Sequence, residues 1–154
     1  MVCLGNICRS PLAEGLLKSK VDPKSVLVDS AGTEGYHIGS TPDPRSVAVA
    51  LKNNIDISGQ RCRLFSKNDF TQFDLIYAMD QSNYTDIVAL ADDNQQIQKV
   101  RLLLEEIDIG TLEVPDPYYG GHRGFELVFE MIDKACDAVV QRILAIQSGE
   151  NGPF

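Results

Sequence analysis

The chain opens with nine residues that decide how it folds, Cys3-Leu4-Gly5-Asn6-Ile7-Cys8-Arg9-Ser10-Pro11. Gly5 and Asn6 are typical of a tight loop, Ser10 is a preferred N-cap residue, and Pro11 suits the first position of a helix. The stretch therefore predicts a short loop that leads from a strand into a helix, with Glu14 in the first turn, where the helix dipole favours a carboxylate. Backbone N–H groups that turn inward in such a loop, together with the start of the helix, form a cradle for an anion.

A thiol and a guanidinium stand near the two ends of this loop. The field of the cradle favours a thiolate at Cys3, which is the nucleophilic form of cysteine. The planar fork of Arg9 can hold two phosphoryl oxygens at once. We therefore expect Cys3 to attack a phosphate held by Leu4, Gly5, Asn6, Ile7, Cys8, Arg9 and Ser10. Taken alone, the pattern is equally compatible with a buried Cys3 that ends a strand and a solvated Arg9 at the start of the helix.

Composition limits the classes of protein to consider. The 154 residues are 44% hydrophobic, a length and content that predict one domain over residues 1–154 with its own core. No apolar run approaches the roughly 20 residues of a membrane-spanning helix, and the start lacks the pattern of a signal peptide, so we expect a soluble, cytoplasmic protein. The 14 basic and 22 acidic residues leave a net charge of −8, which argues against a nucleic-acid partner.

Cysteine and histidine usage excludes two further classes of protein. The four cysteines, Cys3, Cys8, Cys62 and Cys136, show no CxxC spacing, and the chain has only two histidines. Neither a metal site nor a disulfide scaffold is indicated, and no cofactor is expected.

Strand and helix patterns alternate along the chain, without repeats, linkers or low-complexity segments. Helical spacing is found from residue 12 to the stop at residues 21–23, from 44 to 53, from 82 to about 91 and from 125 to about 146. Strand patterns occupy residues 26–28 and 73–79, and residues 97–104 begin as a strand but are ambiguous with helix at their end. Residues 114–121 are expected to form a loop, and residues 148–154 a disordered tail.

This alternation predicts an α/β fold, in which a central parallel sheet of about four strands is covered by helices on both faces. The result is a three-layer, Rossmann-like architecture. Ligands bind beyond the carboxyl ends of the strands in such folds, and Cys3 is expected at that edge.

Asp116 is the candidate for the second chemical role. When a phosphoryl group is transferred to Cys3, the leaving group is the ester oxygen of the substrate. This oxygen departs more readily when an acid protonates it, an effect typically worth about 10² to 10⁴ in rate. Pro115 and Pro117 stiffen the backbone around Asp116, and Gly120 and Gly121 follow it. Without further context an ordinary Asp-Pro turn explains the same residues.

The loop at residues 3–11 and the run Asp116-Pro117-Tyr118-Tyr119-Gly120 resemble the two signature segments of the low-molecular-weight protein tyrosine phosphatases. The resemblance spans nearly the whole chain. It implies the phosphotyrosine protein phosphatase I fold and hydrolysis of phosphotyrosine through a phosphocysteine, with Cys3 as nucleophile, Arg9 as phosphate ligand and Asp116 as general acid. The expected partners are a phosphotyrosine-containing protein or a small aryl phosphate, and inorganic phosphate or sulfate is expected to fit the loop.

The resemblance also suggests a choice of substrate. Tyr36, Tyr118 and Tyr119 are expected to line a deep slot that favours phosphotyrosine over phosphoserine, although each tyrosine is also compatible with partial core packing. Ile7 matches the tyrosine-specific branch, whereas the related protein-arginine phosphatases carry a threonine there. Tyr118 and Tyr119 are also candidate sites of phosphorylation.

Supporting roles follow from the same resemblance. Ser10 is expected to donate a hydrogen bond to the Cys3 thiolate, Asn6 to pin the loop with Ser30 as its partner, and Gln60 to replace a histidine of the family in that network. Cys8 is expected to form a reversible, protective disulfide with Cys3, or else to be a packed thiol. Cys62 and Cys136 are interpreted as structural.

The chain differs from its relatives at the start, where only Met1 and Val2 precede the nucleophile. We expect either a very short central strand or a trimmed start, with lower stability than a longer form. Three alternatives to a tyrosine phosphatase remain on this scaffold: a protein-arginine phosphatase, an arsenate reductase, and a phosphocysteine carrier or catalytically idle phosphate-binding module. The cysteine positions argue against the reductase and Asp116 against the carrier and the idle module.

Overall fold

The computed structural model describes residues 1–150, apart from the side chains of Tyr119 and His122. Its centre is a four-stranded parallel sheet with the strand order β2-β1-β3-β4. The strands are short: β1 is Val2–Cys3, β2 is Ala31–Gly32, β3 is Ile76–Ala78 and β4 is Val100–Leu102. The predicted parallel sheet of about four strands is confirmed, and β1 has one neighbour on each side.

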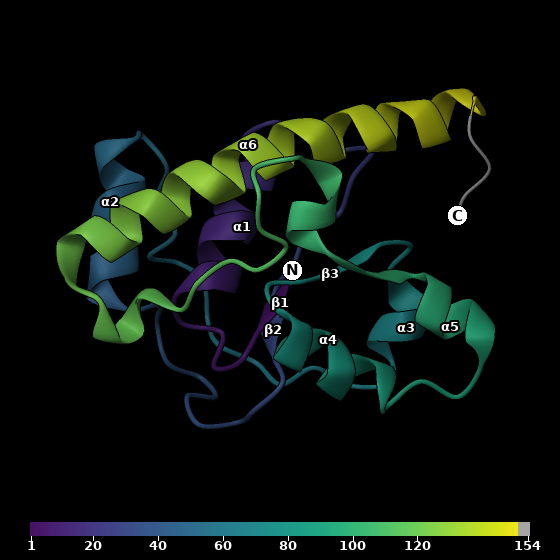
Figure 1. Ribbon diagram of the computed structural model, residues 1–154, viewed down its shortest axis with the longest axis horizontal. Coiled ribbons are helices and arrows are strands. Elements are labelled where there is room, and N and C mark those ends of the chain that lie inside the picture. The colour runs from purple at the N-terminus through teal and green to yellow at the C-terminus, as the bar shows by residue number, and fades with distance from the viewer. Residues whose placement is uncertain (151–154) are drawn as a thin grey trace.

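Helices cover both faces of this sheet, as the alternating pattern predicted (Figure 1). On one face α1 packs against α6, and α2 packs against both of them. On the other face α4 contacts β3 and β4, and α5 contacts β4. The bounds are α1 Arg9–Lys18, α2 Pro44–Lys52, α3 Asp69–Gln72, α4 Gln81–Val88, α5 Asn94–Gln98, α6 Gly121–Ser148, and the 3-10 turns η1 Leu103–Glu106 and η2 Pro117–Tyr119.

The core follows from the two-residue period of the strands. Val2, Ile76 and Val100 point to the side of α4 and join Phe70 in one cluster. The alternate strand residues point to the other side, where the larger cluster unites β1 with α1, α2 and α6. Burial on both faces is why the strands are mostly apolar, with Arg101 in β4 as the exception.

One predicted strand is wrong. Residues 26–28 are not part of the sheet, and β2 lies further on, at Ala31–Gly32. The reason lies in the register, because Val2 pairs with Ala31 and Cys3 with Gly32. The apolar run at residues 26–28 precedes the region where β1 could pair with it, so an apolar pattern alone was not sufficient to make a strand.

The start of the first helix also differs from the prediction. Helix α1 begins at Arg9, and its N-cap residue is Cys8, whose side chain makes no capping hydrogen bond. Ser10 is therefore inside the helix rather than at its cap, because its hydroxyl is occupied by partners in the phosphate loop described below. Glu14 lies beyond the first turn and is buried, where it accepts hydrogen bonds from Lys18 and Ser30.

The remaining bounds differ by a few residues. Helix α6 begins at Gly121, four residues before the predicted start, and ends at Ser148 before the left-handed Gly149. Residues 97–104 divide into the end of α5, strand β4 and the beginning of η1, which resolves the ambiguity of that segment. The expected disordered tail falls largely on residues 151–154, which lie outside the described residues.

A cavity of about 220 Å³ lies at the amino end of β1. Met1, Leu27, Phe73, Tyr77 and Ile143 are among the side chains that line it. The amino group of Met1 donates a hydrogen bond to the carbonyl of Asp29 at 3.0 Å, and burial lowers its pKa. Within residues 1–150, no helix combines the length and the apolar character needed to cross a membrane.

Candidate active site

The loop between β1 and α1 borders a pocket of about 220 Å³ at the carboxyl edge of the sheet. The structure brings residues from three separate segments of the chain into its wall. They are Cys3, Leu4, Gly5, Ile7, Cys8, Arg9, Tyr36, His37, Asp116 and Tyr118. The predicted nucleophile, phosphate ligand and acid therefore share one pocket, although Asp116 is far from the other two in sequence.

The sulfur of Cys3 lies 3.0 Å from the hydroxyl oxygen of Ser10. That hydroxyl oxygen also accepts a hydrogen bond from the side-chain amide of Asn6 at 2.8 Å. A hydroxyl has one proton to donate, and the other acceptor near it is the Ala31 carbonyl, at the longer distance of 3.4 Å. Ser10 is therefore placed to donate its proton to a Cys3 thiolate.

Asn6 holds the loop in shape from beneath. Its backbone is left-handed, with φ of 55°, a conformation that asparagine tolerates better than most residues. Its amide group also donates to Ser30 at 3.0 Å, and Ser30 in turn donates to the buried carboxylate of Glu14 at 2.8 Å. The side-chain oxygen of Asn6 accepts from the backbone N–H of Arg63 at 3.0 Å. The expected contacts of Asn6 with Ser10 and Ser30 are therefore present.

Gln60 does not join this network, contrary to the prediction. Its side-chain amide donates to the carbonyl of Pro11 at 3.0 Å, on helix α1. The nearby Cys62 contacts the loop instead, because its thiol donates to the carbonyl of Asn6 at 2.8 Å. Arg63, which binds the side-chain oxygen of Asn6, follows in the same segment. Sequence reasoning missed this role of residues 62–63, since nothing in their local pattern signals it.

Arg9 is buried, with 3% of its side chain exposed, and it is held by two groups that sequence reasoning did not identify. One guanidinium nitrogen, Nη1, donates to Asp80 at 2.6 Å and to the carbonyl of Val114 at 3.0 Å. Burial lowers the pKa of Arg9, but Cys3 and Asp80 outweigh that effect and the pKa stays above its usual value. The available signal for Asp80 was its position two residues after the end of β3, at the edge of the sheet where ligands bind.

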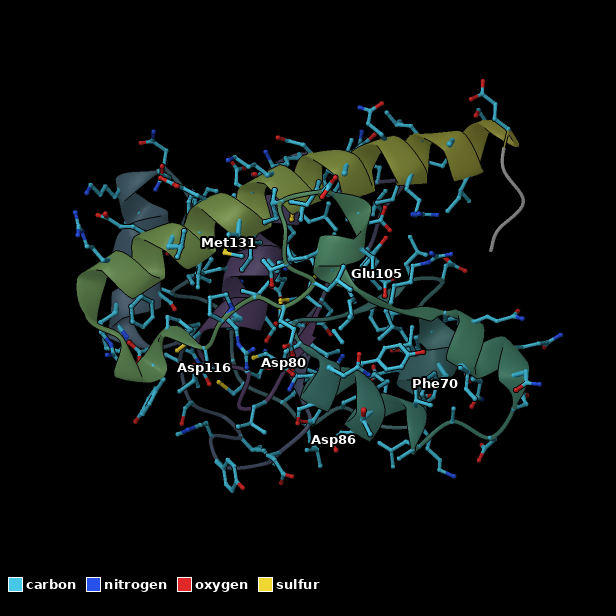
Figure 2. All side chains as sticks on the ribbon, viewed as in Figure 1. Phe70, Asp80, Asp86, Glu105, Asp116 and Met131 are labelled. Carbon is cyan, nitrogen blue, oxygen red and sulfur yellow. The ribbon has the colours of Figure 1, made fainter. Side chains whose placement is uncertain are left out.

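Asp116 lies on the loop that leads into the turn η2 (Figure 2). Its two carboxylate oxygens have different partners. One oxygen, Oδ1, accepts the backbone N–H of Tyr118 at 3.1 Å. The other, Oδ2, lies 3.7 Å from Nη2 of Arg9, the guanidinium nitrogen that Asp80 does not bind. The side chain is 41% exposed, so a group entering the pocket can reach it from the solvent side.

Aromatic side chains are among the residues that border the pocket. Tyr36 and Tyr118 both border the pocket, 70% and 40% exposed. The side chain of Tyr119 lies outside the described residues. His37 is a rim residue that sequence reasoning missed, and it packs edge-on against Tyr36 with ring centroids 6.5 Å apart.

The cysteines differ in their access to the pocket. Cys8 borders the same pocket as Cys3, and burial raises the pKa of its thiol to about 12. Cys62 and Cys136 are buried, and all four thiols are free. Among the residues that the structure describes, no three His, Cys, Asp or Glu side chains are grouped closely enough to hold a metal ion.

Comparison with known proteins agrees with this geometry. A sequence profile described as low molecular weight phosphotyrosine protein phosphatase matches residues 1–148. The chain belongs to the low molecular weight phosphotyrosine protein phosphatase family. It is 38% identical over 149 residues to a low molecular weight protein-tyrosine-phosphatase of Streptomyces coelicolor, covering 92% of this chain and 90% of that protein.

Solved structures of such phosphatases have the same fold. A protein tyrosine phosphatase from Entamoeba histolytica superimposes with a TM-score of 0.88 at 36% identity, covering 97% of this chain and 96% of that one. The Wzb protein of Vibrio vulnificus, in complex with benzylphosphonate, gives a TM-score of 0.81 at 28% identity and covers 92% of this chain and 94% of its own. The Rossmann-like phosphatase fold expected from the sequence is confirmed.

Proposed function

We propose that this member of the phosphatase family hydrolyses phosphotyrosine through a phosphocysteine intermediate. The observation that carries the proposal is the shared pocket of Cys3, Arg9 and Asp116, in which Nη2 of Arg9 lies 3.7 Å from Asp116. A nucleophile, a cation and a proton donor around one space are the groups that phosphoryl transfer from an aryl ester requires. No cofactor has a role in the proposal.

In the first step the thiolate of Cys3 attacks the phosphorus of the substrate. A sulfur–phosphorus bond forms, the bond from phosphorus to the phenolic oxygen breaks, and Asp116 donates its proton to that oxygen. Arg9 and the inward N–H groups of residues 4–10 hold the three remaining oxygens as charge develops on them. Asp80 and the Val114 carbonyl keep the guanidinium plane fixed, so little reorganisation is needed.

In the second step water hydrolyses the phosphocysteine. The Asp116 carboxylate accepts a proton from the water as its oxygen attacks phosphorus, the sulfur–phosphorus bond breaks, and inorganic phosphate is released. The departing sulfur of Cys3 recovers its negative charge, and the hydroxyl of Ser10 at 3.0 Å stabilises it. The same hydrogen bond favours the thiolate for the next attack.

The rim supports phosphotyrosine as the preferred substrate. Tyr36, Tyr118 and His37 place three rings around the mouth of the pocket, where an aryl group can stack. The Vibrio vulnificus relative binds benzylphosphonate, which combines a phosphonate with a ring. We extend the proposal to small aryl phosphates as substrates, to inorganic phosphate or sulfate as ligands of the loop, and to a cytoplasmic location.

The alternatives have less support. Ile7 borders the pocket and differs from the threonine expected of a protein-arginine phosphatase. An arsenate reductase needs mobile resolving thiols, whereas Cys62 and Cys136 are buried and bonded to the carbonyls of Asn6 and Ala13. Neither a carrier nor an idle module requires an acid at Asp116.

Two substitutions test the proposal. Cys3→Ser is expected to abolish hydrolysis of p-nitrophenyl phosphate while inorganic phosphate still binds, as measured by calorimetric titration. Full activity of this variant would show that Cys3 is not the nucleophile. Asp116→Asn is expected to lower kcat/KM more for phenyl phosphate than for 2,4-dinitrophenyl phosphate, whose leaving group departs without a proton. An equal loss on both substrates would exclude Asp116 as the acid.

A further inference from the structure

The start of helix α2 lies between the phosphate loop and the loop that carries Asp116. It contacts the phosphate loop through two hydrogen bonds. The backbone N–H of Asp43 donates to the carbonyl of Ile7 at 2.8 Å, and the hydroxyl of Ser46 donates to the carbonyl of Cys8 at 3.3 Å. This end of α2 is therefore anchored to the loop that holds the phosphate.

Arg45 reaches from the same helix end to the other loop. Its Nη1 donates to the carbonyl of Tyr118 at 3.0 Å, while Nε and Nη2 donate to the carboxylate of Asp43 at 3.1 and 2.9 Å. The guanidinium carbon also lies over two rings, 5.3 Å from the centroid of Tyr118 and 4.7 Å from that of the buried Phe125. Arg45 is thus fixed on one side by Asp43 and Phe125, and it holds Tyr118 on the other.

The contact continues from Tyr118 to the acid. Its backbone N–H donates to Oδ1 of Asp116 at 3.1 Å, and this bond orients the carboxylate whose other oxygen faces Arg9. A chain of contacts therefore links Asp116 to the start of α2, which also contacts the carbonyls of Ile7 and Cys8. The chain runs through the peptide of Tyr118, the guanidinium of Arg45 and the carboxylate of Asp43.

We propose that Arg45 is a positioning residue for leaving-group protonation, which holds the Asp116 loop at the distance from the phosphate loop that proton transfer needs. This inference rests on the proposed phosphatase function and adds to it a residue that does not touch the substrate. A planar fork is required, because three directed hydrogen bonds and two ring contacts are made by one side chain, and the ammonium of a lysine cannot reproduce them.

The experiment compares Arg45→Met and Arg45→Lys with wild type on phenyl phosphate and 2,4-dinitrophenyl phosphate, each also in an Asp116→Asn background. Arg45→Met keeps the apolar stem and is expected to lower kcat/KM for phenyl phosphate by about tenfold or more, because small displacements of a catalytic group are costly in rate. The loss on 2,4-dinitrophenyl phosphate is expected to stay within about twofold. Arg45→Lys should recover part of the loss, since it keeps the charge beside Asp43.

Two controls separate positioning from general damage. Arg61 is an exposed arginine whose guanidinium donates to the carbonyls of Ser58 and Gln60. Arg61→Met therefore removes a guanidinium without touching either loop, and its ratio of kcat/KM values on the two substrates should match that of wild type. The competitive inhibition constant of inorganic phosphate should change by less than about twofold in Arg45→Met, because Asp43 and Ser46 still contact the phosphate loop.

The background variant gives the decisive result. If Arg45 acts through Asp116, then Arg45→Met causes no further loss on phenyl phosphate once Asp116 is Asn. The same factor of loss in both backgrounds, or equal loss on both substrates, would overturn the proposal for Arg45 while leaving the phosphatase function intact. If wild type hydrolyses neither substrate, or if Asp116→Asn is insensitive to the leaving group, the proposed function is wrong and the role of Arg45 is wrong with it.

Discussion

Asn6 is expected to be the most sensitive position of the phosphate loop outside the reacting groups. Its side chain donates two buried hydrogen bonds, to Ser10 at 2.8 Å and to Ser30 at 3.0 Å, and accepts a partly buried one from the N–H of Arg63 at 3.0 Å, and its φ is 55°. Asn6→Ala removes all three bonds and places a residue with a Cβ, but no compensating side chain, in the left-handed region.

The size of the loss follows from these contacts. Leaving the partly buried N–H of Arg63 without a partner costs about 1–3 kcal/mol, and each of the two other bonds contributes about 0.5–1.5 kcal/mol. The left-handed backbone adds about 1 kcal/mol for alanine. We therefore expect Asn6→Ala to lower the free energy of unfolding by about 3–7 kcal/mol, a large part of the stability of a typical domain.

Asn6→Gly separates the backbone from the side chain. Glycine makes none of the three hydrogen bonds, but it adopts positive φ without strain, at the cost of more freedom in the unfolded chain. We expect it to be about 0.5–1 kcal/mol more stable than Asn6→Ala. Both variants should have lower kcat/KM on p-nitrophenyl phosphate, because Ser10 loses the donor that orients its hydroxyl toward Cys3.

Urea unfolding followed by circular dichroism measures these free energies. A loss below about 1 kcal/mol in Asn6→Ala would refute the reasoning, since it would mean that the former partners of Asn6 form hydrogen bonds with water or with one another. A glycine variant less stable than the alanine variant would show that the left-handed backbone of Asn6 is not a source of strain.

Three further outcomes can be measured. Asp80→Asn should keep the N-cap of α4, and so most of the stability, while lowering kcat/KM because the charge beside Arg9 is lost. Asp80→Ala also removes the cap and should lower the free energy of unfolding in urea by about 1 kcal/mol more. Equal stability of the two variants would contradict this role of the cap. Burial raises the pKa of Cys8 and of Cys136 from 9.0 to about 12, so the folded state keeps protons that the unfolded state releases. The free energy of unfolding should therefore fall as the pH rises from 9 towards 12. Mass spectrometry should find that iodoacetamide at pH 8 modifies both thiols only in urea. An extension of four apolar residues ahead of Met1 should raise the melting temperature, because it fills the cavity there and adds ladder hydrogen bonds. An extension with alternate prolines should not raise it, because proline cannot donate to the ladder. Equal melting temperatures of the two extended forms would exclude a contribution of added strand pairing.

Local patterns predicted the elements where the physical cause is local. Pro44 at the first position of α2 and the stop at Asn53 were read correctly, because cap and proline preferences act within a few residues. The apolar residues 26–28 were misread as a strand, because strand formation depends on a partner at the right register, and on that side of the sheet β1 pairs with Ala31–Gly32. Ser10 was misread as a cap for a similar reason, since Cys3 and Asn6 compete for its hydroxyl.

The candidate site divides in the same way. Residues 3–11 by themselves placed a thiol and a guanidinium near the two ends of one short loop that leads into a helix, because these residues are contiguous in the sequence. The tertiary structure alone placed Asp116 3.7 Å from Arg9, supplied Asp80 and the Val114 carbonyl as partners of that guanidinium, and set Arg45 between the two loops. These contacts join residues that are 71 to 107 positions apart, and their geometry depends on the packing of the sheet and helices between them, which no local preference encodes.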